Sequence, residues 1–92
     1  MIFEWDEAKR LINLEKHGVD FVDASKMWDG IMLVAVDARR EYGESRYVGT
    51  GRIEGRVMVV VYTNRSANVV RIISLRKANS RETRSYENAT NE

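Results

Sequence analysis

The sequence contains no cysteine and no proline, and it has a single histidine. Without cysteine the chain cannot form a disulfide, a thiolate metal site or a cysteine nucleophile. One histidine cannot supply the ligands of a familiar zinc site, and no paired-acid motif suggests magnesium. The G-x-S-x-G elbow of serine hydrolases is also missing. We therefore expect neither a metal ion nor a cofactor.

Long hydrophobic runs are missing as well. No apolar stretch approaches the roughly 20 residues that a membrane span needs. The segment Met1–Asp6 has neither the basic nor the apolar region of a signal peptide. With 92 residues, 43% apolar and 32% charged, the chain is expected to form one soluble domain over residues 1–92. We expect it in the cytoplasm, without membrane contact and with residues 88–92 as a flexible tail.

The formal net charge of +1 hides an uneven distribution. Residues 1–30 carry seven acids and four bases, a net charge of −3, whereas residues 31–92 carry seven acids and eleven bases, a net charge of +4. Ten of those eleven bases are arginine, whose planar fork matches phosphate oxygens. The second part is therefore a candidate nucleic-acid surface, although arginines that merely decorate exposed strands would explain the pattern equally well.

Two short helices are predicted near the start of the chain. The first should span about residues 6–17, because Asp6 is a typical N-cap and Gly18 a typical stop. The second should begin at Asp20 and end at Asp29 and Gly30. Their expected core-facing residues are Ala8, Leu11, Ile12 and Leu14 in the first helix, and Phe21, Ala24 and Trp28 in the second.

Apolar runs then predict strands. Val57–Thr63 is typical of a central strand with both faces covered, and a polar link joins it to Val69–Lys77 in a hairpin. Two earlier strands are expected at Ile31–Val36, as a buried strand, and at about residues 45–53, followed by a turn at Glu54 and Gly55. Ile2, Phe3 and Trp5 form an edge strand or a strap.

A short C-terminal helix completes the predicted fold. Asn79 and Glu82 form a capping-box pattern, and Tyr86 is the one large apolar residue with which the helix can dock. The economical arrangement is an α+β fold with an antiparallel sheet of about four strands. The two N-terminal helices and the short C-terminal helix should pack on one face of that sheet.

Cations gather where the last strand meets this helix. Arg76, Lys77, Arg81 and Arg84 lie within nine residues, beside backbone N–H groups that favour an anion. A phosphate site is therefore predicted here. Arg71 and Arg76 have opposite parity along an ideal strand, so they face opposite sides of the sheet unless a bulge intervenes.

Arginines with tyrosines suit RNA cleavage by the RNA's own 2′-hydroxyl. The enzyme then needs only positioning, stabilisation of negative charge and modest proton transfer. His17, in the last turn of the first helix, is a candidate general acid or base. A histidine that caps the helix carbonyls is at least as good an explanation.

Several motifs resemble those of the BrnT toxin family, over about residues 2 to 87. Gly30 departs from the family, because members often carry proline there. The matching motifs are FEWDEAK at Phe3–Lys9, N-x-x-K-H-G-V-x-F at residues 13–21, VVYT at residues 60–63, RIISxRKA at residues 71–78, Arg81 with Glu82, and Tyr86.

The resemblance implies a RelE-like ribonuclease fold and inhibition of translation through RNA cleavage. It also implies neutralisation by a BrnA-type antitoxin, whose ribbon-helix-helix part binds operator DNA, so that the toxin meets DNA only through the complex. Combined with the residues above, it implies His17, Arg71, Arg76 and Lys77 as catalytic residues, and Lys16, Arg81, Arg84 and Tyr86 as RNA-binding residues.

Other interpretations stay open. Lys16 also fits a solvated helix end, and Arg71 also fits a strand arginine that pairs with an acid. At the level of function, the alternatives are a non-catalytic module that binds nucleic acid or a partner, and a degenerate toxin that survives mainly to bind its antitoxin. An antitoxin that works by occlusion should cover Arg76 and Lys77.

Overall fold

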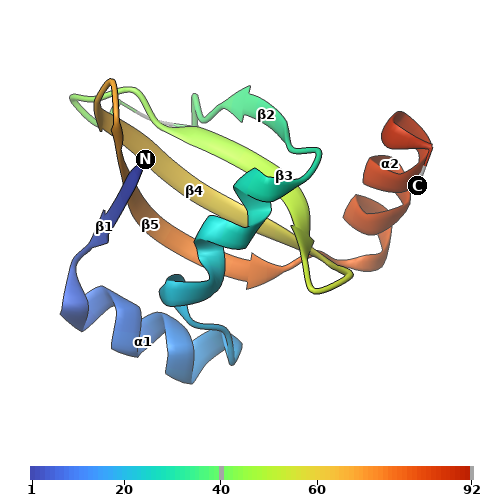
Figure 1. Ribbon diagram of the computed structural model, residues 1–92, viewed down its shortest axis with the longest axis horizontal. Helices are drawn as coiled ribbons and strands as arrows, with labels where there is room; N and C mark the ends of the chain where they lie inside the picture. Colours follow the sequence, from blue (N-terminus) through green and yellow to red (C-terminus); the bar gives the residue numbers. More distant parts are fainter. Residues whose placement is uncertain (40, 92) are drawn as a thin grey trace.

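The structure is a computed structural model that describes residues 1–39 and 41–91 (Figure 1). Within these residues a five-stranded sheet runs in the order β1-β5-β4-β3-β2. The strands are β1 (Ile2–Trp5), β2 (Leu33–Val36), β3 (Tyr47–Ile53), β4 (Arg56–Ser66) and β5 (Val69–Lys77). The helices are α1 (Glu7–His17), the 3₁₀ helix η1 (Phe21–Asp29) and α2 (Ser80–Thr90). None of these helices is long and apolar enough to cross a membrane.

The α+β class is confirmed, but the expectation of about four antiparallel strands is wrong. β1 is a fifth strand, and it pairs with β5 in parallel, from Ile2 opposite Val69 to Trp5 opposite Ile72. The other three pairs of neighbouring strands are antiparallel, so the sheet is mixed. Phe3 and Trp5 pack against the core, which holds this N-terminal segment on the edge of the sheet.

The helices cover different faces of the sheet, so the expectation that all pack on one face is wrong. α1 and η1 lie on one face, above a core that includes Phe21, Met58 and Val60. α2 packs on the opposite face, where Tyr86 contacts a cluster of Val57, Val59 and Ala78. The cause is that β4 has apolar residues at successive positions. Successive side chains point to opposite faces, so both faces of this strand need to be covered. α2 covers one end of its face, and we call the remainder, around Val48, Val61 and Ser74, the open face.

The second helix lies where predicted, with Asp20 as N-cap, but it is a 3₁₀ helix. Side chains three residues apart share one side of such a helix. Trp28, predicted as a core residue, is therefore only partly buried, and it packs edge-on against Phe3 and Tyr62 with ring centroids 5.0 Å apart in both pairs. The fully buried residues of η1 are Phe21, Ala24 and Met27.

α1 has the predicted caps, Asp6 and Gly18, and Gly18 adopts a left-handed conformation with φ +70°. Its predicted apolar stripe is wrong. Leu11 and Ile12 are 53% and 64% exposed, and the buried residue of the helix is Asn13. The helix therefore rests on β5 through a polar side chain, and two large apolar side chains face outward.

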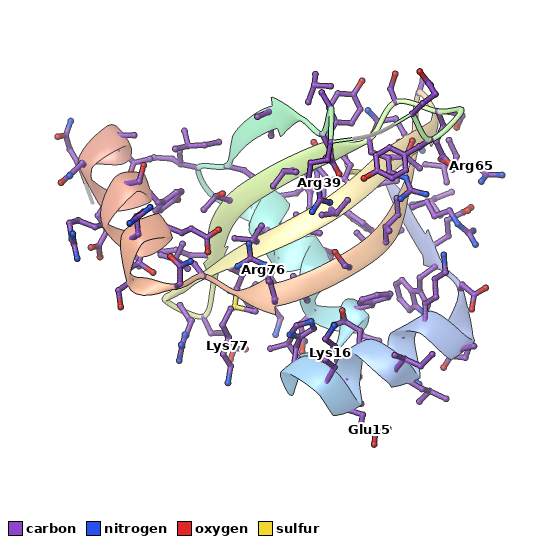
Figure 2. All side chains as sticks on the ribbon, turned by 180° about the vertical axis from the view of Figure 1, so that it is seen from behind. Glu15, Lys16, Arg39, Arg65, Arg76 and Lys77 are labelled. Atoms are coloured by element: carbon purple, nitrogen blue, oxygen red, sulfur yellow. The ribbon has the colours of Figure 1, made fainter. Side chains whose placement is uncertain are left out.

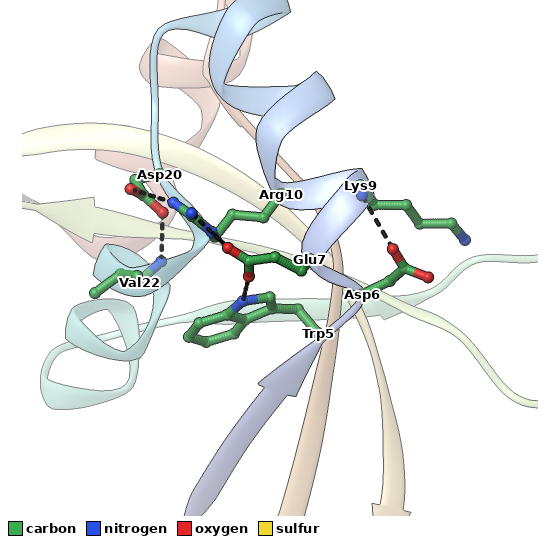
Figure 3. Close-up of polar contacts among 7 residues, drawn as sticks. All are labelled: Trp5, Asp6, Glu7, Lys9, Arg10, Asp20 and Val22. Carbon is green, nitrogen blue, oxygen red and sulfur yellow. Dashed lines mark hydrogen bonds and ion pairs between the residues drawn. The ribbon is translucent and has the colours of Figure 1, made fainter.

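Polar contacts fix α1 between β1 and η1 (Figure 3). Arg10 donates to Glu7 at 2.7 Å and to Asp20 at 3.0 Å, and the Trp5 indole donates to Glu7 at 3.1 Å. The hydrogen bond from Arg10 is the main reason why the pKa of Glu7 is lowered. This network sets how the N-terminal elements meet.

The remaining elements follow the sequence with one exception. β2 is an exposed edge strand, with Val34 and Val36 at 49% and 68% exposure, and the expectation of a buried strand is wrong. The β3–β4 turn at Glu54 and Gly55 has positive φ at both residues, as a two-residue hairpin turn of type I′ requires. α2 begins after a complete Asn79–Glu82 capping box and continues to Thr90, into the segment expected as a tail.

Candidate active site on the open face of the sheet

One extra residue in β5, Ile73, decides which side chains reach the open face. Ile73 has no Cα partner on β4, and an unpaired residue of this kind reverses the alternation of side chains beyond it. Arg71 and Arg76 therefore project from the same face of the sheet. In an ideal strand they would face opposite sides, and the bulge at Ile73 removes this difference. The partner pairs are Val59 with Arg76, Val61 with Ser74, and Thr63 with Arg71.

A pocket of about 370 Å³ lies on the open face beside Arg76. Figure 2 looks onto this face and shows Arg39 and Arg76 together over the sheet. We call it the arginine pocket. Its apolar floor is formed by Val48, Val59 and Val61, and its polar lining includes Arg39, Arg76 and Ser74. An apolar floor with cations above it offers contacts for a base and for a phosphate at once.

Arg39 is held over the pocket by Asp37. Its Nε and Nη2 each donate to a different carboxylate oxygen of Asp37 at 2.8 Å, and Tyr42 donates to the same carboxylate at 3.3 Å. The Asp37 side chain is 1% exposed, whereas that of Arg39 is 72% exposed. The hydrogen bond from Arg39 lowers the pKa of Asp37 to about 2. Arg39 was not among the residues predicted for the site, although an acid directly after a strand with an arginine two residues later is a usable signal in the sequence.

Arg76 is held in the same way by Glu82 of α2. Nη1 and Nη2 of Arg76 donate to the two carboxylate oxygens of Glu82, each at 2.8 Å, while Nη1 lies 3.4 Å from the carbonyl oxygen of Lys77. Glu82 also accepts from the Asn79 backbone N–H at 2.9 Å, so the capping box positions the carboxylate. The remaining N–H groups of Arg76 can donate to another acceptor.

These contacts also set the electrostatics of the pocket. Hydrogen bonding from Arg76 lowers the pKa of Glu82 to about 2, so Glu82 is ionised at neutral pH. The pKa of Arg76 is raised, first by its hydrogen bond to Glu82, while the nearby charge of Arg39 acts in the opposite direction. Two permanently charged guanidiniums therefore lie close together over the valine floor.

His17 and Lys16 lie next to the arginine pocket and outside it. They line a smaller hollow of about 220 Å³ between α1 and β5, together with Lys9. Ser74 lines both this hollow and the arginine pocket. Lys16 is seen in Figure 2 on α1, across β5 from Arg76. The structure thus brings the two groups of predicted residues to either side of Ser74.

The other predicted residues are more dispersed. Arg71 is on the open face but pairs with Glu4 of β1 at 2.7 Å, which fits the structural interpretation left open for it. Lys77 lies opposite Met58, a residue of the core under α1 and η1, so Lys77 projects from the opposite face to Arg76. The two neighbouring cations therefore belong to different surfaces.

The predicted residues of α2 also separate. Arg81 lines a hollow of about 250 Å³ beside Leu33 of β2, whereas Arg84 lines a different pocket on the other flank of the helix. Tyr86 docks α2 as expected: it is 2% exposed, and its hydroxyl donates to the carbonyl oxygen of Ile31 at 2.6 Å. A ring so buried has almost no surface to offer RNA, which weakens the prediction that Tyr86 binds it.

The described residues contain no group of three or more histidine, aspartate or glutamate side chains placed to hold a metal ion.

Comparison with known proteins identifies a similar family and a similar structure. A family model described as "Ribonuclease toxin, BrnT, of type II toxin-antitoxin system" matches residues 5–82. The crystal structure of the ribonuclease toxin BrnT from Brucella abortus resembles the chain with a TM-score of 0.66 and 25% sequence identity, covering 87% of this chain and 100% of that chain. Comparison with curated proteins gave no match.

Proposed function

Because the chain belongs to the BrnT family of ribonuclease toxins of type II toxin–antitoxin systems, we propose that it is a metal-independent endoribonuclease. In this proposal the protein acts in the cytoplasm, and its cleavage of RNA inhibits translation. The family implies an RNA substrate and an antitoxin partner. We further propose that the antitoxin is of the BrnA type, with a ribbon-helix-helix part that carries the complex to operator DNA. We also propose that the fold is RelE-like.

The observation that carries the proposal is that Arg39 and Arg76 line the same pocket, above an apolar floor. In the proposed reaction the 2′-oxygen of a ribose attacks the adjacent phosphorus and loses its proton. The bond from phosphorus to the 5′-oxygen of the next nucleotide breaks, and that oxygen takes up a proton, which leaves a 2′,3′-cyclic phosphate. Negative charge grows on the phosphoryl oxygens in the transition state, where fixed guanidiniums stabilise it most.

RNA that enters the pocket across Ser74 would meet Lys16 and His17 on α1. We propose that these residues contact the RNA beside the reacting phosphate, with His17 available for proton transfer. Arg71, whose partner is Glu4, is assigned to the edge of this surface.

Cleavage of total RNA by purified protein, with and without EDTA, tests this function. The variants Arg39→Ala and Arg76→Ala should each lower kcat/KM by about a hundredfold, the usual loss for one donor to developing negative charge. Arg65→Ala removes an exposed arginine at the end of β4 and is the matched control. Loss of wild-type cleavage in EDTA would reject metal independence, and full activity of Arg76→Ala would place the site elsewhere.

A non-catalytic module that binds nucleic acid or a partner is the second candidate. It is favoured by the fact that both arginines of the pocket already hold carboxylates, which suits ligand exchange as well as catalysis. Binding of RNA that weakens steeply with salt, without cleavage even when ribosomes are added, would support this candidate. A degenerate toxin would bind its antitoxin and lack both properties.

Occlusion of Arg76 is the proposed mode of neutralisation. An antitoxin segment over the open face would cover the arginine pocket, whereas covering Lys77 as well requires the partner to reach the other face. Protection of Arg76 and Lys77 from a chemical label in the complex would show whether one or both are covered. A complex that leaves Arg76 fully exposed would reject occlusion.

A further inference from the structure

A second pocket, of about 490 Å³, opens between the β3–β4 turn and the flank of α2 that faces away from β2. Three arginines line it, Arg52 from β3, Arg56 from β4 and Arg84 from α2. The hydroxyl-bearing residues Ser80 and Thr83 complete its polar lining, and Glu87 is the one acid that lines it within the described residues. We call this hollow the turn pocket.

Arg52 is the fixed member of the three. Its Nη1 donates to the carbonyl oxygen of Gly55 at 2.8 Å, and its guanidinium lies 3.5 Å from the Glu87 carboxylate. The guanidinium carbon also lies 5.5 Å from the centre of the Tyr86 ring. These contacts fix Arg52 at one side of the pocket and pair its charge with that of Glu87.

Arg56 and Arg84 supply charge that is not neutralised locally. Both residues are exposed, and neither makes an ion pair with an acid in the part of the chain that the structure describes. Two guanidiniums that converge on one hollow from a strand and a helix can bind the same anion from two sides.

The turn pocket lies on the same face of the sheet as the arginine pocket, and α2 packs between them on Val57 and Val59. Val57 lines the turn pocket and Val59 the arginine pocket, and these are successive residues on one face of β4. Likewise Ala78 lines the turn pocket and follows Arg76 by two positions, a spacing of about 6.6 Å in a strand. A single strand of RNA bound at Arg76 would have to pass the start of α2 to reach Arg84.

We propose that the turn pocket binds a phosphodiester of single-stranded RNA, next to the nucleotides that the arginine pocket holds. This proposal rests on the proposed ribonuclease function. Among the described residues, the lining offers guanidiniums and hydroxyls and no exposed aromatic ring. The pocket would therefore contact the RNA backbone and make no base-specific contact. It also gives Arg84 a place in RNA binding that is separate from that of Arg76.

The test uses the double variant Arg56→Ala/Arg84→Ala in the full chain, with Arg65→Ala as the control. The probe is a fluorescent single-stranded RNA of about twelve nucleotides, 2′-O-methylated so that it cannot be cleaved. Its affinity is measured over a range of salt concentrations. For the loss of one phosphate contact, the slope of log affinity against log salt should become shallower by about 0.7, and affinity at low salt should fall by about tenfold.

Length dependence adds a second measurement. A dinucleotide fills the arginine pocket alone, so the double variant should lose several-fold less affinity for it than for the longer RNA. An unchanged salt slope, or an equal loss with Arg65→Ala, would overturn the proposal. Cleavage by wild type with an unchanged slope rejects the turn pocket alone, whereas a shallower slope without any cleavage rejects the ribonuclease and keeps the turn pocket.

Discussion

The side-chain amide of Asn13 pairs with both backbone groups of Leu75. Asn13 Nδ2 donates to the Leu75 carbonyl oxygen at 2.8 Å, and the Leu75 N–H donates to Asn13 Oδ1 at 3.2 Å. β1 ends opposite Ile72, so within the described residues this stretch of β5 has no neighbouring strand on that side. The amide of Asn13 takes the place that a strand would occupy, and it anchors α1 to the sheet.

Replacement of Asn13 by leucine should therefore destabilise the fold. Two buried backbone groups would lose their partner, at a cost of about 2–4 kcal/mol in the free energy of unfolding. Urea unfolding measures this change. Ile12→Ala, at an exposed position of the same helix, should stay within about 0.5 kcal/mol of wild type. Equal stability of the two variants would show that the Asn13 contacts do not hold α1.

Glu82→Gln separates the orientation of Arg76 from the capping of α2. The glutamine keeps an oxygen that can accept from the Asn79 N–H, but it removes the charge that holds Arg76. We expect tighter RNA binding, because the negative charge beside Arg76 is removed, and a turnover about tenfold lower, because Arg76 loses its fixed position.

Asn79→Ala is the matched control for that variant. It removes the cap of α2, at a cost of about 1 kcal/mol, and leaves the Arg76–Glu82 pair in place. If the two variants lose turnover equally, the effect of Glu82 comes from helix stability and our assignment of its role is wrong.

Stability at low pH should depend on Asp37 and Glu82. Both carboxyl groups have a pKa of about 2 in the folded protein, against about 4 in an unfolded chain. Because the folded pKa is the lower one, each ion pair stabilises the fold fully above about pH 4 and loses this contribution as the pH falls toward 2. Urea unfolding over this range should show a shallower decline for Asp37→Asn than for wild type.

Glu15→Gln is the control for the acid series, because Glu15 is exposed on α1 and forms no ion pair with another described residue. Its decline should match that of wild type. An Asp37→Asn variant that declines as steeply as wild type would mean that the Asp37–Arg39 pair contributes nothing to folding.

Ser74→Phe should block RNA without disturbing the core. Ser74 lies on the open face opposite Val61 and lines both the arginine pocket and the hollow of Lys16 and His17. A phenyl ring there should lower RNA cleavage by about tenfold or more, while the free energy of unfolding changes by about 1 kcal/mol or less. Ser66→Phe, at the exposed end of β4, is the control. Normal cleavage by Ser74→Phe would place the RNA path elsewhere.

Local signals in the sequence predicted the elements well. The caps Asp6, Gly18 and Asn79 each act on residues within one helical turn, and the β4–β5 hairpin joins neighbouring segments. The parallel pairing of β1 could not be predicted in this way, because its partner lies at the other end of the chain. No local sequence pattern indicates a contact between residues so far apart in the chain.

The candidate site was only partly predictable for the same reason. Arg76 stood out because it closes a strand beside a helix start, but its separation from Lys77 depends on strand alternation that sequence proximity hides. Arg71 and Arg76 share a face only because Ile73 is unpaired, and no sequence pattern indicates that this residue is unpaired. Arg39 reaches the pocket through a loop, and the one local signal for its position is Asp37, two residues earlier, whose burial only the structure shows.

The parallel pairing of β1 with β5 also orders events during synthesis. The first strand has no partner until residues 69–72 have left the ribosome, and Arg76 and α2 follow later still. A nascent chain therefore cannot complete the surface around Arg76 while most of its sheet is untranslated. The surface around Arg76 can therefore form only after the final residues of β5 have emerged.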